Sequence, residues 1–152
     1  TADCVPIILF DTNNHIIGCI HAGWKGAISG IIENTIEKFR ELSSRNKIFA
    51  TVGPCIGEKS YEVSQDFYKK FILKSKKNSI YFINKKNNKK LFNLRKYVND
   101  KLLKLNVKVD NINKDTFREK SNFFSYRRSQ KLGHNDYGRC ISVIAMTKFG
   151  LN

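Results

Sequence analysis

Two side chains near the start of the chain, Cys4 and His21, are of the types that bind metal ions or form a nucleophile–base pair. Thiolates and imidazoles are common zinc ligands, and a cysteine activated by a histidine is a familiar covalent catalyst. The structural alternative is that Cys4 is a small buried hydrophobe and His21 a hydrogen-bonded core residue, since free cysteine is among the most buried residue types. The elements that carry the two side chains decide whether they can meet.

A β-hairpin is predicted to carry both residues. Residues 5–10 and 15–21 are short apolar runs, and the Asp-Thr-Asn-Asn sequence between them has turn chemistry. If the turn centres between residues 12 and 13, Cys4 lies opposite His21 with Cβ atoms about 5 Å apart. That separation suits a shared metal or a Cys–His pair. A turn shifted by one pair would place Cys4 opposite Gly23 and weaken both interpretations.

A glycine-rich turn, Ala22-Gly-Trp-Lys-Gly26, follows the hairpin and leads into a helix. The free backbone N–H groups and positive dipole end of such a turn favour an anion, and Lys25 adds a full charge there. The turn matches neither a Walker loop nor the dinucleotide fingerprint. An ordinary strand-to-helix turn is the alternative interpretation.

Three arginines, Arg127, Arg128 and Arg139, are concentrated in one polar stretch of a chain that otherwise favours lysine, with seven arginines against twenty-one lysines. The guanidinium fork binds phosphate and carboxylate in a bidentate manner. We therefore expect a phosphate site formed by Lys25 with one or more of these arginines. Alternatively, they pair with acidic side chains such as Asp136 or hold backbone carbonyls of the loop.

Strands and helices are predicted to alternate along the chain. Apolar residues at helical spacing predict a helix over 28–42, and Ser64 and Asn93 are placed to cap two further helices. The remaining expected elements are strands at 49–52, 80–83, 107–112 and 141–147, a lysine-rich hairpin tip or loop at 85–90, and long loops over 114–139. This order predicts an α/β (α+β) sandwich in one domain, residues 1–152.

The composition favours a folded protein over a disordered or membrane-spanning one. The chain is 41% hydrophobic and 12% aromatic, which argues against disorder. No apolar run has the length of a membrane span and no signal peptide is recognisable, so we expect a cytoplasmic protein without membrane contact. The formal charge of +15 makes nucleic-acid binding a candidate function. Because the lysines are dispersed among asparagines and isoleucines, a solvated surface is the preferred interpretation.

Four segments together resemble the laccase-domain, or polyphenol oxidase, family of metal-dependent purine nucleoside phosphorylases. They occur in order from one end of the chain to the other: Thr1-Ala-Asp-Cys4, His21-Ala-Gly-Trp-Lys-Gly26, Gly53-Pro-Cys-Ile-Gly57 with Tyr61-Glu-Val63, and Phe123-Phe-Ser-Tyr-Arg-Arg128 with Gly138-Arg139. None of the four is specific alone. The chain starts without methionine at the first of them, so we expect the beginning of the domain to be absent.

The resemblance implies a metal site of one cysteine and two histidines, of which Cys4 and His21 would be two ligands. The other histidine would come from a segment upstream of Thr1. The implied metal is zinc, with copper as the second candidate, and the implied reaction is phosphorolysis of purine nucleosides, with adenosine deamination as a companion activity. The implied fold is an α/β sandwich related to the cytotoxic necrotizing factor deamidases. The expected partners are purine nucleosides and phosphate, and we expect a monomer.

Other functions remain as alternatives. A metal-free Cys–His hydrolase or amidase would use Cys4 as nucleophile and His21 as base, and peptidoglycan-precursor editing has been attached to bacterial members of the family. Copper oxidation of phenols ranks low, because a laccase needs several coppers and a histidine-rich ligand set, whereas this chain has three histidines. A basic nucleic-acid-binding module and a folded but catalytically silent fragment complete the set.

Overall fold

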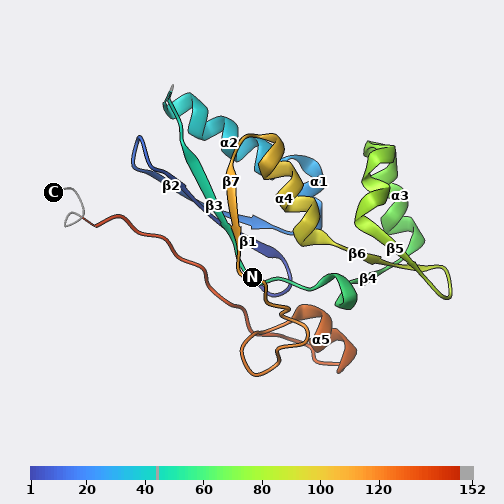
Figure 1. Ribbon diagram of the computed structural model, residues 1–152. Coiled ribbons are helices and arrows are strands. Elements are labelled where there is room, and N and C mark those ends of the chain that lie inside the picture. Colours follow the sequence, from blue (N-terminus) through green and yellow to red (C-terminus); the bar gives the residue numbers. More distant parts are fainter. Residues whose placement is uncertain (44, 148–152) are drawn as a thin grey trace.

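The computed structural model describes residues 1–43 and 45–147, and Figure 1 shows a mixed arrangement of helices and two sheets. The larger sheet has the strand order β2-β1-β3-β7. Its strands are β1 (Val5–Asp11), β2 (Ile16–Ala22), β3 (Ile48–Val52) and β7 (Lys108–Asn111). β1 pairs antiparallel with β2 and β3, and β3 pairs parallel with β7. The predicted α/β (α+β) class is confirmed.

Helices cover one face of this sheet (Figure 1). They are α1 (Trp24–Ser29), α2 (Ile31–Leu42) and α4 (Leu94–Lys104). The inward side chains of β1 alternate, as a half-buried strand requires, so that Val5, Ile7 and Leu9 are fully buried. They belong to the same buried core as the apolar stripe of α2, which includes the fully buried Ile32 and Ile36. This layer holds the hairpin, and therefore Cys4 and His21, in place.

A second, smaller sheet has the order β4-β6-β5 and packs with α3 (Gln65–Lys74) through aromatic rings. Its strands are β4 (Glu62–Val63), β5 (Phe82–Lys85) and β6 (Lys89–Phe92). The Phe71 and Phe92 rings lie 4.7 Å apart between centroids, and Trp24 joins the cluster through Phe67 at 4.8 Å. Fully burying one phenylalanine contributes roughly 1.5–3 kcal/mol. The cluster therefore fixes the position of Trp24, which immediately follows the hairpin.

Several predicted elements are confirmed. The Ser64 hydroxyl accepts from Phe67 N at the start of α3, and the Asn93 side chain accepts from Lys96 N at the start of α4. The lysine-rich segment is a hairpin tip between β5 and β6, where Asn87 has φ +57°.

Four predictions are wrong in detail. The expected helix over 28–42 is two helices, because Gly30 with φ +97° ends α1 and starts α2. The strand expected at 80–83 begins only at Phe82, after a 3-10 helix over Lys76–Tyr81. Residues 114–139 are not only loop, since Ser125 caps α5 (Tyr126–Lys131). Residues 141–147 join neither sheet, and the Ile141 side chain is 87% exposed.

The hairpin register also differs from the prediction by one pair. Val5 pairs with Ala22 and Pro6 with His21, so the turn centres between Asn13 and Asn14. No helix in the described part of the chain is long and apolar enough to cross a membrane.

Candidate active site

Cys4 lies beside Gly23 and not opposite His21. A Cβ atom added at Gly23 would lie 3.0 Å from the Cys4 Sγ atom, so the space at this glycine is filled by the thiol. His21 pairs with Pro6, which makes Cys4 and His21 diagonal neighbours. Diagonal neighbours across an antiparallel pair are about 7–8 Å apart. The hairpin therefore brings the two side chains to one end of the sheet but does not place them in contact.

The Cys4 thiol lines a cavity of about 240 Å³, which we call the Cys4 cavity. Its walls are mostly apolar and aromatic, with one cationic and one anionic side chain. The lining residues are Ala2, Asp3, Cys4, Trp24, Ile56, Tyr61, Leu94, Tyr126 and Arg127. Apart from Leu94, they come from the four segments that the sequence singled out, and each of the four contributes. A cavity with aromatic walls and few polar groups is the usual setting for a small ligand.

Asp3 joins three of these segments. Its carboxylate accepts from Thr116 Oγ1 at 2.7 Å, from Ser125 Oγ at 3.0 Å and from the Arg127 backbone N–H at 2.7 Å. Its carbonyl accepts from Ile56 N at 3.0 Å. The residue is 8% exposed and its φ is +80°. Sequence reasoning assigned no role to Asp3, because all its donors lie far along the chain.

Arg127 is held inside the cavity wall. Its Nη1 donates to the Glu62 carbonyl, and its guanidinium carbon lies 5.2 Å from the centre of the Tyr61 ring. Arg127 also lines the Cys4 cavity, so this cationic residue borders the same space as Cys4. A guanidinium beside a cavity is suited by type to bind an anion.

Arg128 has a different environment. Its guanidinium donates to the carbonyls of Thr116, Phe117 and Phe123. A guanidinium that donates to three carbonyls holds residues 116–128 together. Arg128 therefore has the structural role that the sequence left open, in which an arginine bonds backbone carbonyls of the loop.

Lys25 and Arg139 both lie at the surface. Lys25 Nζ is 5.7 Å from the centre of the neighbouring Trp24 ring, on the first turn of α1. Arg139 donates to the Tyr137 carbonyl at 3.0 Å, and its side chain is 60% exposed. Neither borders the Cys4 cavity. Of the four predicted phosphate ligands, Arg127 alone lies in the wall of the cavity.

Burial, with the neighbouring Asp3 carboxylate, raises the pKa of the Cys4 thiol. A thiol with a raised pKa is a poor nucleophile at neutral pH, which counts against the metal-free hydrolase. Desolvation lowers the pKa of His21 and favours the neutral imidazole that metal ligation requires. Burial raises the pKa of Cys55 to about 12, so this fully buried cysteine is part of the core.

The Gly53–Gly57 turn is fixed by Asp115, a second residue that sequence reasoning missed. The Asp115 carboxylate accepts from Gly57 N at 3.0 Å and from Ser60 Oγ at 2.6 Å. A Cβ atom at Gly57 would lie 2.4 Å from its Oδ2 atom, so only glycine fits. This turn places Ile56 and Tyr61 in the wall of the Cys4 cavity.

His21 lines a separate hollow of about 210 Å³, together with Cys19 and Cys140. Within residues 1–43 and 45–147, no three His, Cys, Asp or Glu side chains are grouped so as to hold a metal ion. Cys4 and His21 are suitable donors by type, but these residues do not form a metal site by themselves.

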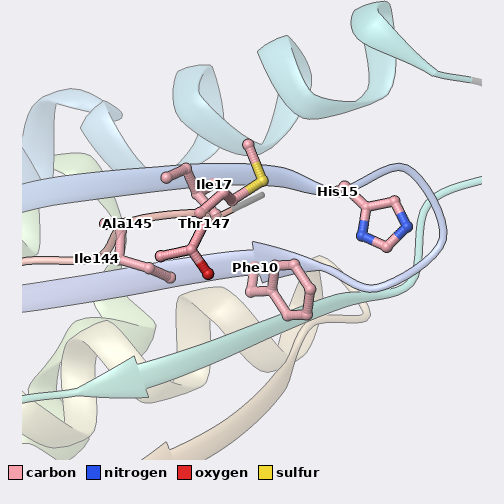
Figure 2. A pocket seen from close by; sticks show the side chains of 7 residues that line it. Phe10, His15, Ile17, Ile144, Ala145 and Thr147 are labelled. Atoms are coloured by element: carbon pink, nitrogen blue, oxygen red, sulfur yellow. The ribbon is translucent and has the colours of Figure 1, made fainter. Parts of the chain in front are cut away.

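A further pocket of about 310 Å³ lies away from the predicted site residues, between the hairpin and residues 144–147 (Figure 2). Phe10, His15 and Ile17 line it from the hairpin, and His15 lies by the hairpin turn, apart from the other labelled side chains. Among the described residues that line it, His15 alone has an ionisable side chain, so these residues offer little for catalysis.

Comparison with known proteins supports the resemblance. Residues 1–147 match the family model described as multi-copper polyphenol oxidoreductase laccase. A purine nucleoside phosphorylase of Rickettsia conorii is 40% identical over 148 residues, which are 96% of this chain and 61% of the relative. The Escherichia coli purine nucleoside phosphorylase YfiH is 32% identical over 136 residues, 88% of this chain and 54% of the relative.

Solved structures agree with the observed fold. The crystal structure of Bacillus licheniformis YfiH superposes with a TM-score of 0.77 at 29% identity, covering 86% of this chain and 51% of the other. A Neisseria meningitidis protein superposes with a TM-score of 0.75 at 30% identity, covering 84% and 52%. The chain thus spans between half and about three fifths of the length of these relatives.

Proposed function

The chain belongs to the multi-copper polyphenol oxidoreductase laccase family, and on this premise we propose that the protein containing it is a purine nucleoside phosphorylase. The observation that carries the proposal is the Cys4 cavity, where a thiol, the Arg127 guanidinium and aromatic walls border one space. Relatives that match most of this chain bear the name purine nucleoside phosphorylase. The cavity has the chemistry that an anion and a flat base together require.

In this proposal Arg127 binds the phosphate. A phosphate oxygen forms a bond to the ribose C1′ carbon as the bond from C1′ to the purine nitrogen breaks, and the departing base takes up a proton. Arg127 would hold the phosphate charge through bidentate contacts, while Trp24, Tyr61 and Tyr126 offer ring faces for the base. Lys25 and Arg139 stay candidates for the approach of phosphate, since both are exposed cations.

The proposal includes a zinc ion bound by Cys4 and His21, with copper as the alternative metal. It needs at least one further ligand from an upstream segment, because residues 1–43 and 45–147 supply no third donor at the site. When bound, zinc would supply a Lewis acid. Adenosine deamination is the companion reaction of the proposal, and it is tested in the same assays.

The test compares this chain with the extended protein, by which we mean the chain preceded by its upstream segment. Metal content and phosphate-dependent release of hypoxanthine from inosine are measured for both. About one zinc per chain and release only with phosphate are expected for the extended protein. Cys4→Ala should abolish both properties.

Cys19→Ala is the matched control, because Cys19 is an exposed cysteine of β2 outside the Cys4 cavity. It should retain metal and activity. An extended protein that binds no metal yet cleaves an amide through Cys4 would replace the phosphorylase with the cysteine hydrolase. Ammonia released from adenosine measures the deaminase reaction.

A further inference from the structure

The Asp3 carboxylate is a buried hub between distant parts of the chain. It accepts three hydrogen bonds of 2.7 to 3.0 Å, and the donors lie 113 to 124 residues away in sequence. Two of them, the Ser125 hydroxyl and the Arg127 backbone N–H, are at the start of α5. A buried carboxylate with several donors fixes the groups around it, because breaking any one bond leaves a polar atom without a partner.

The hub continues beyond its direct contacts. The Ser125 Oγ atom that donates to Asp3 also accepts from Arg128 N at 3.1 Å. The Asp3 carbonyl accepts from Ile56 N at 3.0 Å. One residue therefore connects the segment of Cys4, the turn that carries Ile56 and the helix that carries Arg127, and all three segments line the Cys4 cavity.

Asp3 adopts a backbone conformation that is unfavourable for most residues other than glycine. Its φ of +80° lies in the left-handed region, which asparagine and aspartate tolerate better than other non-glycine residues. Such conformations persist where the surroundings over-determine them, and they cluster at functional sites. In this conformation the Asp3 carboxylate meets α5 while the thiol of the next residue, Cys4, borders the cavity.

We propose that Asp3 is a positioning residue that fixes the main chain of Arg127 with respect to the Cys4 thiol. Arg127 is held from two sides, by Asp3 at its backbone and by the Glu62 carbonyl at its side chain. Removing the hydrogen bond from Asp3 leaves the guanidinium attached but misplaced. The effect on phosphate rests on the proposed function, whereas the effect on the geometry does not.

Asp3→Ala is the direct test, because it removes the carboxylate that accepts from the Arg127 backbone N–H. Asp3→Asn is the conservative comparison, since asparagine offers one oxygen and one NH₂ group. Ser125 and Arg127 donate to Oδ2 and Thr116 donates to Oδ1, so an asparagine oxygen in the place of Oδ2 keeps the bond to Arg127 N, and the Thr116 hydroxyl can reverse and accept from the NH₂ group. The matched control is Asp11→Ala, since Asp11 is another buried carboxylate with several donors, at the opposite end of β1.

The first measurement needs no catalysis. Hydrogen exchange of the Arg127 amide, measured by NMR on this chain, should become at least about tenfold faster in Asp3→Ala, the change that about 1.4 kcal/mol of lost protection produces. Exchange corrected for global stability should be unchanged in Asp3→Asn and in Asp11→Ala. Equal acceleration in Asp3→Ala and Asp11→Ala, or none in Asp3→Ala, would overturn the proposal.

The second measurement is kinetic and uses the extended protein. In Asp3→Ala the KM for phosphate should rise about tenfold while the KM for inosine stays within about twofold, since the Arg127 backbone N–H loses its acceptor. Asp3→Asn, which keeps that acceptor, and Asp11→Ala should leave both constants near those of wild type. Equal rises of the two KM values would show a merely structural role and overturn the proposal.

A variant that fails to fold is replaced by Ser125→Ala, which removes one donor of the hub and retains the carboxylate. It should raise the KM for phosphate in the same direction, and an unchanged value would count against Asp3. If the wild-type extended protein shows no phosphorolysis, the proposed function fails, and hydrogen exchange alone decides the role of Asp3.

Discussion

The Arg127 guanidinium carbon lies 5.2 Å from the centre of the Tyr61 ring, and both side chains border the Cys4 cavity. A cation over an aromatic face is stabilised by about 0.5–2 kcal/mol, more when water is excluded. Burial raises the pKa of Tyr61, so its hydroxyl is a neutral donor at physiological pH. The pair therefore presents one fixed positive charge and one neutral hydroxyl to a ligand.

Arg127→Ala should raise the KM for phosphate in the extended protein by about 10- to 100-fold, which corresponds to the removal of a charge-assisted hydrogen bond of roughly 1.5–3 kcal/mol. Arg127→Lys should recover only part of the loss, because lysine lacks the planar fork. Steady-state kinetics at varied phosphate measure both. An Arg127→Ala protein with the phosphate dependence of wild type would remove Arg127 from the site.

Arg128→Ala should reduce stability more than any change at Arg139. Three carbonyls lose their donor, which at about 1 kcal/mol each lowers the free energy of unfolding by about 3 kcal/mol. Arg139→Ala is the control on an exposed side chain and should cost no more than about 0.5 kcal/mol. Urea unfolding measures the difference. Equal stability of the two variants would show that Arg128 does not hold the loop.

Gly57→Ala should disrupt the turn that places Tyr61. Its Cβ would lie 2.4 Å from Asp115 Oδ2, and moving Asp115 breaks its bonds to Gly57 N and Ser60 Oγ. We expect a loss of about 2 kcal/mol. Gly26→Ala is the matched control, because its added Cβ meets nothing closer than 3.4 Å, and it should stay within about 1 kcal/mol of wild type. Thermal unfolding distinguishes the two.

Asp11 should make the fold sensitive to acid. Burial alone would raise its pKa, but donors from Asn46, Lys47 and Asn14 lower it to about 2. A lowered folded pKa contributes stability that is present above about pH 4 and is lost as the pH falls toward about 2.

Asp11→Asn should thus be less stable than wild type by about 2 kcal/mol at pH 7, and the difference should vanish near pH 2. Urea unfolding of both proteins at pH values of about 7, 4, 3 and 2 measures this difference in stability. The three lower values cover about two pH units, the range over which Asp11 titrates. A difference that is constant with pH would contradict the assignment.

Local chemistry made much of the fold predictable. Ser64 and Asn93 cap their helices as expected, since a cap needs only residues three positions away. The helix break at Gly30 was missed because a single glycine inside an apolar stripe is compatible with a continuous helix. Residues 141–147 were expected to form a strand from their β-branched composition, but propensity alone does not supply a partner.

The hairpin register shows why the site was harder to predict. Asp11 belongs to β1, and its carboxylate accepts from Asn46 Nδ2 at 2.6 Å and from Lys47 N at 3.0 Å. These distant contacts favour a turn one pair further along than local turn chemistry suggested. The same holds for Cys4, whose type was recognisable from its motif, whereas its neighbours Asp3, Tyr61 and Arg127 were brought together only by the fold.

The long separation between Asp3 and its donors also sets the order in which the molecule assembles. Contacts between residues more than about a hundred positions apart form slowly, because a large loop must close before they contribute. The hairpin and the helices involve near neighbours, which favours their earlier formation. During synthesis the Cys4 cavity cannot be completed until the ribosome has delivered Arg127, so a nascent chain that stops before α5 would lack its site.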